Sequence, residues 1–228
     1  MPPGCASGSD LETSPTSRLR CDGRVERELR ERGFQAIAGV DEAGRGCLFG
    51  PVFAAAVILP AAHGIRGLND SKQLTAARRE ELAGAIRSRA VAWAVAQAEP
   101  EEIDRINIYQ ASRLAMRRAV SQLAPPPDFV LVDAMRIDLE VAQLGLIQGD
   151  ARVHSIAAAS ILAKVSRDAC MLEWDSIYPR YGLARHKGYG TAEHLTALQE
   201  FGPTPQHRVT FEPVRRCVRL SIPAEAGR

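Results

Sequence analysis

The chain lacks the features of a secreted or membrane-embedded protein. Its 228 residues include five cysteines, an odd number, and no Cys-x-x-Cys pair. This usage argues against a disulfide scaffold or a zinc ribbon and favours a reducing compartment. No apolar run approaches the ~20 residues of a transmembrane helix, and no basic segment followed by an apolar one resembles a signal peptide. We therefore expect a cytoplasmic protein.

A large excess of charge of one sign is also missing. Lysine and arginine number 29 against 27 aspartates and glutamates, which gives a net charge of +2, so the bulk composition does not indicate a polyanion-binding protein. Residues 178–220 nevertheless hold seven Lys or Arg against three Asp or Glu. A nucleic-acid groove and a solvated surface explain this local excess equally well. No glycine-rich nucleotide-binding motif is present, so a nucleotide cofactor has no support.

The composition predicts one main folded unit with an extension at each end. The apolar content of 46% is ample for one sizeable core. Residues 1–33 are expected to form a disordered or partly helical extension, because the start is rich in Gly, Ser, Pro and Thr and residues 24–32 resemble a short exposed helix. We expect the main folded domain in residues 34–220 and a flexible tail in residues 221–228.

Hydrophobic patterns predict strands and helices in mixed order. Consecutive strands early in the chain indicate hairpins, so an α/β fold with a mixed sheet is favoured over an all-parallel one. The expected strands are residues 35–40, 51–59 (buried on both faces), 91–98, 129–133 and 144–147. The expected helices are residues 75–90, 100–123 with a break near Asn107, 153–174 and 191–201.

The most informative segment is Ala38–Gly46, in which an apolar run leads into Asp41 and Glu42 and then into Gly44-Arg45-Gly46. Two adjacent buried acids repel each other and lose hydration, and a bound cation would remove both costs. The Gly-Arg-Gly turn offers backbone N–H groups and a guanidinium to a phosphate or a sugar. Neighbours on a regular strand point to opposite faces, so both acids can serve one site only if the chain leaves strand geometry at Glu42.

Two further acids are placed where they could join this site. Asp133 ends a short apolar strand, and Asp150 precedes the helix expected at 153–174. If the strands that end at Asp41 and Asp133 are neighbours, their carboxylates meet at one edge of the sheet. Such oxygen ligands suit Mg²⁺ or Mn²⁺, and two ions about 4 Å apart can activate water and stabilise the leaving oxygen of a phosphodiester. In the alternative interpretation, Asp41 caps a turn, and Asp133 and Asp150 are ordinary loop acids. This interpretation is favoured for any one of these residues taken alone, but not for the whole set.

Two loops offer candidate substrate contacts. Ser71 and Lys72 combine a hydroxyl with a cation, as a phosphate contact would, although the same loop also leads into the next helix. Lys187 and Tyr189 lie on a glycine-flanked loop, where the ring can stack on a base or a sugar or can simply pack on the surface. The small-residue stretch 155–160 indicates close helix packing more than a nucleophile.

Taken together and in order, these motifs resemble bacterial ribonuclease HII from about residue 37 to about residue 220. The resemblance implies an RNase H-like fold, with a mixed five-stranded sheet flanked by helices and a small helical C-terminal region. It implies that four acids bind Mg²⁺ or Mn²⁺, namely Asp41, Glu42, Asp133 and Asp150. The motifs that carry it are Gly39–Gly46, Asn69–Lys72, Val132-Asp133, Gly149-Asp150, Ser155–Lys164 with Arg167-Asp168, and His186–Tyr189.

The resemblance also implies an activity and its substrates. These are endonucleolytic cleavage of RNA in RNA/DNA hybrids, and cleavage 5′ of single ribonucleotides in duplex DNA, leaving 3′-hydroxyl and 5′-phosphate ends, in ribonucleotide excision repair. It implies that backbone groups of Gly44, Arg45 and Gly46 recognise the ribose 2′-hydroxyl and that Tyr189 stacks on the neighbouring sugar. The 2′-hydroxyl is the group that distinguishes RNA from DNA, and close backbone approach requires glycine. A monomer is expected.

The chain departs from the family pattern at two positions. Ala134 follows Asp133 where the family generally has glycine, and we expect it to restrict the backbone there. Cys47 follows Gly46 where proline is common, and a small apolar filler is the favoured interpretation of it. Neither change removes a catalytic group. The rival hypotheses are another metal-dependent nuclease or phosphatase, and a non-catalytic nucleic-acid-binding module with a structural cation.

Overall fold

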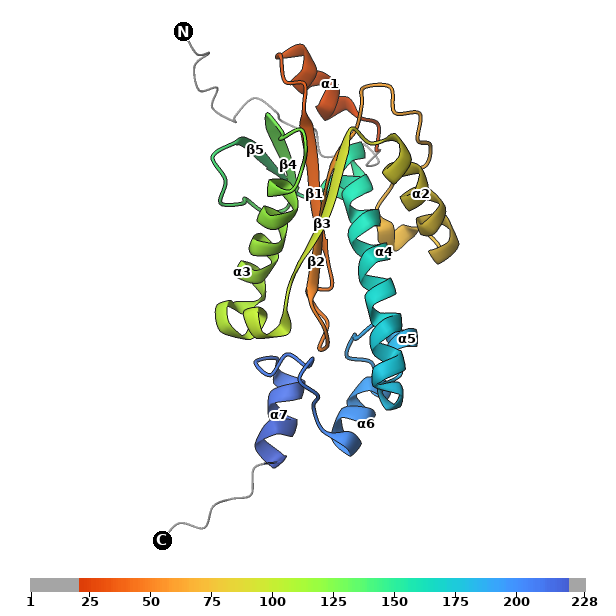
Figure 1. Ribbon diagram of the computed structural model, residues 1–228, viewed down its shortest axis with the longest axis vertical. Coiled ribbons are helices and arrows are strands. Elements are labelled where there is room, and N and C mark those ends of the chain that lie inside the picture. Colours follow the sequence, from red (N-terminus) through yellow and green to blue (C-terminus); the bar gives the residue numbers. More distant parts are fainter. Residues whose placement is uncertain (1–20, 222–228) are drawn as a thin grey trace.

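A mixed five-stranded sheet lies at the centre of the computed structural model, which describes residues 21–221, the side chains as far as 218 (Figure 1). The strand order is β3-β2-β1-β4-β5. β1 pairs antiparallel with β2, and β2 with β3, whereas β4 runs parallel to both β1 and β5. The predicted mixed sheet is therefore confirmed. The strands are β1 (Ile37–Ala43), β2 (Val52–Ile58), β3 (Ala92–Ala98), β4 (Phe129–Asp133) and β5 (Ala142–Leu146).

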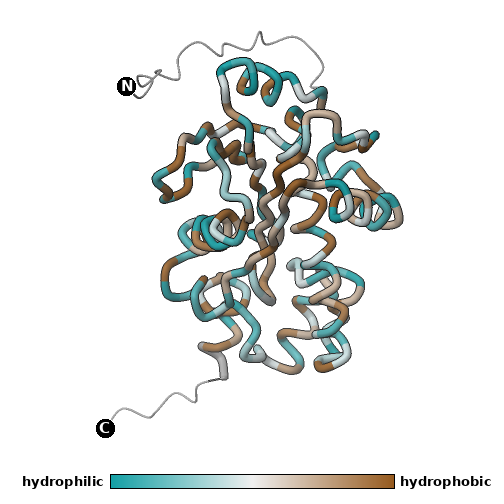
Figure 2. The backbone as a smooth tube through the Cα atoms, turned by 45° about the horizontal axis from the view of Figure 1, so that its top comes forward, coloured by the Kyte–Doolittle hydropathy of each residue, from teal (hydrophilic) through white to brown (hydrophobic). Residues whose placement is uncertain are grey.

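Helices cover both faces of this sheet. α3 (Pro100–Ser121) lies on one face, and α2 (Ala76–Arg89) and α4 (His154–Ile177) lie on the other (Figure 1). Alternate residues of β2 belong to two cores: Ala54 and Ala56 pack on the α3 side, and Ala55 and Val57 on the α2 and α4 side. This strand is buried on both faces, as predicted, and Figure 2 shows its hydrophobic colour in the middle of the molecule.

The predicted helices and the predicted break are present, although α4 continues to Ile177, beyond the end predicted at 174. Thr75 caps α2 by accepting a hydrogen bond from the Arg78 N–H at 3.3 Å, and Thr191 caps α6 (Ala192–Phe201) through the His194 N–H at the same distance. Inside α3, Asn107 has a φ of 67°, which interrupts the helix there. Of the extensions predicted at 1–33 and 221–228, residues 1–20 and 222–228 lie outside the described residues.

The helix predicted at 24–32 is present as α1 (Arg24–Glu31), but the expectation that it is exposed was wrong. Leu29 packs in a core cluster that includes Ile37. Glu26 is only 5% exposed, and its Oε1 accepts hydrogen bonds from the Ser155 N–H at 2.9 Å and the Ser155 hydroxyl at 3.1 Å. The reason is that two residues one turn apart suffice to dock a helix, even when most of its side chains are charged.

α4 lies directly against the central strand. A Cβ at Gly39 on β1 would come within 2.1 Å of the Ser155 carbonyl carbon and 2.2 Å of the Ile156 nitrogen. The residues from Ile156 to Ala159 are completely buried. Close packing is therefore the role of the small-residue stretch 155–160, as predicted, and it brings α4 to the strand that carries Asp41.

The C-terminal region is helical, as the family resemblance implied. It contains α5 (Leu183–His186), α6 and α7 (Glu212–Ser221). Elsewhere and at its start, the chain forms three short 3₁₀ turns, namely η1 (Ser71–Gln73), η2 (Gly149–Ala151) and η3 (Pro179–Tyr181). Isolated β-bridges join this region to the β1–β2 connection, between Cys47 and Tyr189 and between Phe49 and His207. No helix among the described residues is long and apolar enough to cross a membrane.

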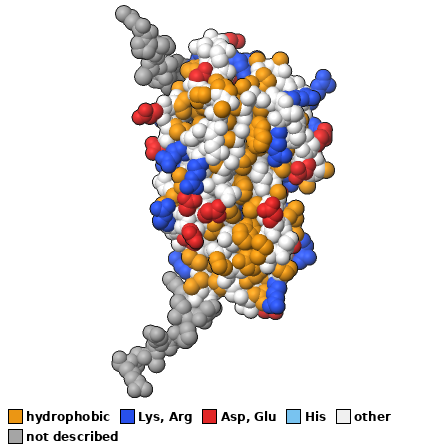
Figure 3. Space-filling view, viewed as in Figure 1, with side chains coloured by type: hydrophobic (Ala, Val, Ile, Leu, Met, Phe, Trp, Pro, Cys, Tyr) orange, Lys and Arg blue, Asp and Glu red, His pale blue; other side chains and the backbone are white. Residues whose placement is uncertain are grey.

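The basic excess of residues 178–220 does not form one open cationic face. Arg208 is completely buried, Arg185 pairs with Glu193, and Glu212 pairs with Arg215 and Arg216. On the face seen in Figure 3, acidic and basic side chains are interspersed. The solvated-surface interpretation therefore accounts for much of this excess.

Candidate active site

Asp41 and Asp133 lie side by side at the ends of two parallel strands. Val40 of β1 pairs with Val132 of β4, so the next residue on each strand is an acid. Asp41 is 5% exposed, and burial raises its pKa well above the usual range. The charges of Glu42 and Asp133 add to this rise, whereas the Ser160 hydroxyl and the Glu42 N–H, 2.7 Å from Oδ1, partly offset it. The predicted meeting of these two acids is confirmed.

Glu42 belongs to the same strand, because β1 continues past it. Glu42 pairs with Ala54, and Ala43 pairs with Phe53. The expected departure from strand geometry at Glu42 was therefore wrong, since the pairing with β2 extends to the turn. The condition attached to it was wrong as well, because the charge of Glu42 raises the pKa of Asp41 and the charge of Asp133 raises that of Glu42 although β1 continues. Oε1 of Glu42 lies 3.3 Å from Nη1 of Arg45, whereas its Oε2 is buried without a described partner. Burial raises the pKa of Glu42 although Arg45 opposes the rise.

Asp150 joins the group from η2. The Gly149 N–H beside it donates to Oδ1 of Asp133 at 2.7 Å, which connects η2 to the end of β4. Asp150 is 6% exposed, and burial, followed by the charges of Asp70 and Asp133, raises its pKa to about 6. Burial also raises the pKa of Asp133, and the Gly149 N–H opposes that rise. Three separate segments thus bring four carboxylates to one edge of the sheet.

Asp70 is a fifth acid, which the sequence reasoning did not assign to the site. Its Oδ1 accepts a hydrogen bond from the Lys72 N–H at 2.9 Å at the start of η1, and its charge raises the pKa values of Asp133 and Asp150. Burial lowers the pKa of Lys72, but Asp70, Asp150, Asp41 and Asp133 together raise it above its ordinary value. The Asn69–Lys72 motif was the signal available for Asp70, which there resembled an ordinary turn residue.

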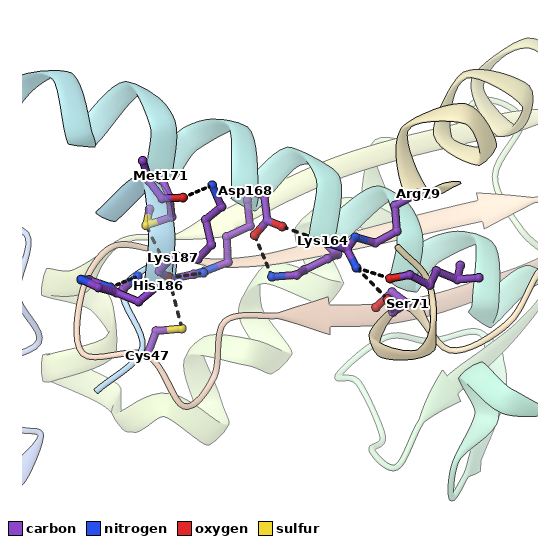
Figure 4. A network of polar contacts seen from close by, with 12 residues as sticks. Cys47, Ser71, Arg79, Lys164, Asp168, Met171, His186 and Lys187 are labelled. Carbon is purple, nitrogen blue, oxygen red and sulfur yellow. Dashed lines mark hydrogen bonds and ion pairs between the residues drawn. The ribbon is translucent and has the colours of Figure 1, made fainter. Parts of the chain in front are cut away.

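Ser71 lies between these two residues but faces inward. It is 4% exposed, and its hydroxyl is hydrogen-bonded to the Ser160 hydroxyl, with the two oxygens 2.9 Å apart. Its carbonyl accepts from Arg79, which also lies 3.7 Å from Asp168 (Figure 4). The contacts of Ser71 therefore hold η1 against α4, and its predicted substrate contact stays a prediction.

The donor set of this cluster fits a hard divalent cation. It consists of carboxylate oxygens with raised pKa values, one of which, Oε2 of Glu42, is buried without a described partner. Within residues 21–221, no three His, Cys, Asp or Glu side chains already stand in an arrangement that could hold one ion. In this arrangement Oδ1 of Asp133 accepts a hydrogen bond from the Gly149 N–H, and Oε1 of Glu42 accepts one from Nη1 of Arg45.

The Gly-Arg-Gly turn follows β1 beside the acids. Gly44 has a φ of 93°, and a Cβ there would lie 2.0 Å from Nε of Arg167, so only glycine fits. Arg45 and Gly46 are exposed. Cys47 is completely buried, and burial raises the pKa of its thiol, which agrees with the filler interpretation.

The loop that carries Tyr189 lies next to this turn. Tyr189 is 43% exposed, and its ring lies 5.9 Å from Nζ of Lys164 and 6.0 Å from Cζ of Arg167. Figure 4 shows Lys164 paired with Asp168, at 2.7 Å, on the side of α4 that faces the loop. Nζ of Lys187 donates to the Ala184 carbonyl at 2.8 Å. The two predicted contact loops therefore flank α4.

Three buried histidines support the Tyr189 loop. The sequence reasoning named His186 only as the start of the Tyr189 motif and did not single out His194 or His207. Nδ1 of His186 accepts from the Gly188 N–H at 3.2 Å, and Nδ1 of His194 lies 2.9 Å from the Tyr189 carbonyl oxygen. Nε2 of His194 is 3.1 Å from Nε2 of His207. Burial lowers the pKa of all three, that of His207 to about 3.

This pKa predicts an acid-sensitive fold. The folded chain keeps His207 neutral, whereas the unfolded chain binds a proton near pH 6.5, so stability is lost as the pH falls from about 6.5 towards 3. We expect His207→Phe to reduce the pH slope of the unfolding free energy over this range by up to about 1.4 kcal/mol per pH unit. Urea unfolding at several pH values measures the slope, and identical slopes would contradict the prediction.

Ala134, beside Asp133, carries a φ of 49°, in the left-handed region. A Cβ there costs about 1–2 kcal/mol, so we expect Ala134→Gly to raise the unfolding free energy by about 1 kcal/mol despite the greater entropy of the unfolded chain. Urea unfolding measures the change. Ala142→Gly, at the exposed start of β5, is the control and should destabilise. A loss of stability in Ala134→Gly would contradict the strain argument.

Comparison with known proteins agrees with this geometry. The family described as Ribonuclease HII matches residues 38–214. The Ribonuclease HII of Solibacter usitatus is 64% identical over 205 residues, which cover 90% of this chain and 90% of that protein. The Ribonuclease HII of Koribacter versatilis is 52% identical over 197 residues, covering 86% of this chain and 78% of that protein.

Solved structures share the fold. The crystal structure of the ribonuclease H2 from Pyrococcus horikoshii OT3 has a TM-score of 0.70 and 26% identity, and the match covers 81% of this chain and 97% of that one. Bst-RNase HIII in complex with Mn²⁺ has a TM-score of 0.62 at 20% identity, covering 82% and 70%, which shows the fold alone.

The sheet order and the carboxylates at the ends of parallel β1 and β4 define a nuclease of the ribonuclease H class, whose members are metal-dependent hydrolases of RNA paired with DNA. The family match and the relatives that align over most of their length identify one family within this class. The chain belongs to the ribonuclease HII family.

Proposed function

We propose that this ribonuclease also cleaves duplex DNA at single embedded ribonucleotides, on their 5′ side, leaving 3′-hydroxyl and 5′-phosphate ends. The observation that carries the proposal is the continuity of β1 with the turn that follows it. Asp41 and Glu42 lie in the strand, and Gly44, Arg45 and Gly46 come directly after it. The groups that recognise one ribose and the groups that catalyse cleavage of the adjacent phosphodiester would thus belong to one rigid segment.

In this proposal Asp41, Glu42, Asp133 and Asp150 hold Mg²⁺ or Mn²⁺, which supplies Lewis-acid stabilisation and an activated water. Mn²⁺ is present in the solved complex of Bst-RNase HIII, which has the same fold. Asp150, whose pKa lies near 6, orients the attacking water and accepts a hydrogen bond from it.

The substrate contacts come from the two sides of the acid cluster. Lys72, which faces several carboxylates, and Ser71 contact the phosphate backbone on the side of η1. Arg45 and Lys187 contact the backbone on the other side, and Gly44 and Gly46 allow the turn to approach the ribose. Tyr189, exposed beside Lys164, stacks on the sugar at the RNA–DNA junction.

A single assay tests this function. Labelled all-DNA duplex, RNA/DNA hybrid and duplex with one ribonucleotide are incubated separately with the purified chain and with Mg²⁺ or Mn²⁺. We expect cuts in the second and third substrates only, and 3′-hydroxyl ends on the third. Cleavage of all-DNA duplex would favour a general nuclease, and binding without any cut would favour a nucleic-acid-binding module.

Tyr189→Ala tests the junction contact. Loss of one base- or sugar-stacking ring costs about 1–3 kcal/mol, so we expect cleavage of the single-ribonucleotide duplex to fall roughly 10-fold or more. Cleavage of a long hybrid should fall less, because the enzyme can bind such a hybrid at many positions along its length. Tyr109→Ala, an exposed tyrosine on α3, is the matched control. Equal losses on both substrates would rule out a special role at the junction.

A further inference from the structure

Two completely buried arginines lie beneath the Gly-Arg-Gly turn. Arg167 comes from α4, and Arg208 lies between α6 and α7. A buried guanidinium requires acceptors, and here these are chiefly backbone carbonyls. Arg167 donates to the carbonyls of Lys187 at 2.8 Å and Phe49 at 3.1 Å. Figure 4 shows Lys187 and Cys47 together beneath α4, where these segments meet.

Arg208 binds one carbonyl of the turn itself and one in the connection that follows it. Its Nη1 donates to the Arg45 carbonyl at 2.8 Å, and its Nε donates to the Gly50 carbonyl at 2.9 Å. The Phe211 ring lies 5.3 Å from its Cζ, and the guanidinium is held between these groups. Burial lowers the pKa of Arg208 to about 10, so the group remains charged at neutral pH.

The hydrogen bond to Arg45 determines where the next N–H points. The C=O and N–H of a planar trans peptide point in opposite directions. Arg208 draws the Arg45 carbonyl towards the interior, so the N–H of Gly46 in the same peptide points outward. Gly46 is exposed, and its N–H donates to no described residue.

Steric effects alone do not set this orientation. A Cβ at Gly46 would meet no atom within 4 Å, and its φ lies outside the left-handed region. Within the turn, the Cys47 N–H bonds to the Gly44 carbonyl at 3.3 Å, which spans the peptide without holding its carbonyl. The contact with Arg208 is therefore the one that fixes the plane of the Arg45–Gly46 peptide.

Fold stability does not by itself require this cation. A buried charge carries a desolvation cost, and an apolar side chain of similar size is often as stable. Nη2 of Arg208 is buried without a described partner, so the group is not fully compensated. What an apolar side chain cannot supply is a donor that orients the Arg45 carbonyl.

We propose that Arg208 is a positioning residue for ribose recognition, which holds the Arg45–Gly46 peptide so that the Gly46 N–H faces the 2′-hydroxyl of the substrate. The inference rests on the proposed function, because it assigns the selectivity of that site to a residue outside the substrate surface. It predicts that loss of Arg208 weakens discrimination between ribose and deoxyribose more than it weakens binding to the duplex.

The test compares two labelled duplexes that differ by a single 2′-hydroxyl. Their dissociation constants are measured by fluorescence anisotropy in EDTA for the parent, Arg208→Lys and Arg208→Met, with thermal melts to establish folding. We expect about 10-fold weaker binding to the ribonucleotide duplex in Arg208→Met, the order expected for one lost hydrogen bond, and a smaller loss in Arg208→Lys, which keeps a donor. Binding to the all-DNA duplex should stay within about twofold of the parent. The ratio of the two dissociation constants, all-DNA over ribonucleotide duplex, should therefore approach one in Arg208→Met.

Arg118→Lys is the matched control, because Arg118 donates to the Gln97 carbonyl at 2.8 Å from α3, away from the turn. It should keep the parent's ratio. An unchanged ratio in the Arg208 variants, or equal weakening on both duplexes, would overturn the inference. If the parent itself neither distinguishes the duplexes nor cuts the ribonucleotide one, the proposed function fails instead.

A measurement on the parent chain keeps the inference testable if neither Arg208 variant folds. The amide resonance of Gly46 is followed by NMR while each duplex is added in EDTA. We expect it to shift with the ribonucleotide duplex and to stay unchanged with the all-DNA duplex. An unshifted Gly46 amide in a chain that distinguishes the two duplexes would overturn the assigned orientation.

Discussion

Replacing Asp41 with asparagine is expected to lower kcat by at least about 100-fold on both the hybrid and the single-ribonucleotide duplex. Loss of a residue that merely supports a metal ligand costs 10–100-fold, and Asp41 is proposed to be a ligand itself. Its buried position next to Glu42 and Asp133 leaves no other acid in its place. Initial rates with Mg²⁺ and with Mn²⁺ measure the loss.

The same variant should remain folded and should bind the hybrid. Burial and two neighbouring acids raise the pKa of Asp41, so its ionised form destabilises the folded chain at pH 7–8. A neutral asparagine removes this cost, and we expect a higher melting temperature in EDTA. Asp138→Asn is a matched control outside the cluster. Near-parental cleavage by Asp41→Asn would contradict the ligand assignment.

Replacing Gly39 with alanine is expected to cost about 3 kcal/mol of unfolding free energy, the upper end of the usual cost of overpacking. The new Cβ would lie 2.1 Å from the carbonyl carbon of Ser155, and this atom belongs to the backbone of α4 and cannot rotate away. The helix must move from β1, which opens a core of completely buried alanines. Urea unfolding measures the loss, and cleavage should fall as well, because Ser160 moves away from Asp41.

Gly84→Ala provides the control for this substitution. Gly84 is exposed on α2, where a Cβ meets no atom within 4 Å, so alanine should stabilise the helix by about 1 kcal/mol. The two changes add the same methyl group and differ only in surroundings. A Gly39→Ala chain as stable as the parent would show that α4 does not lie as close to β1 as the structure has it.

Local sequence patterns predicted most of the elements, because strand and helix periodicities are properties of neighbouring residues. The run before Asp133 coincides with β4, and the break at Asn107 was visible as a change of pattern. The patterns were less informative about where pairing stops. β1 extends through Glu42 because β2 continues beside it, and nothing local to Glu42 reports its partner strand.

Contacts between distant segments account for what was missed. The docking of α1 depends on Ser155, far along the chain, which accommodates the buried carboxylate of Glu26. Asp70 enters the acid cluster only because η1 is held against α4 through Ser71. The buried histidines follow no local pattern, since His186 ends α5, His194 lies on α6 and His207 lies in the connection between α6 and α7.

The sequence by itself determined the mixed sheet, its helices and the family, because the order and the spacing of Asp41, Asp133 and the glycine turn can be seen directly in the sequence. Only the tertiary structure decided that Asp41 and Asp133 are neighbours and that Arg208 lies beneath Arg45. The physical reason is that electrostatic and hydrogen-bond energies depend on distances in space. Residues 45 and 208 become adjacent only when the C-terminal region packs on the turn after β1.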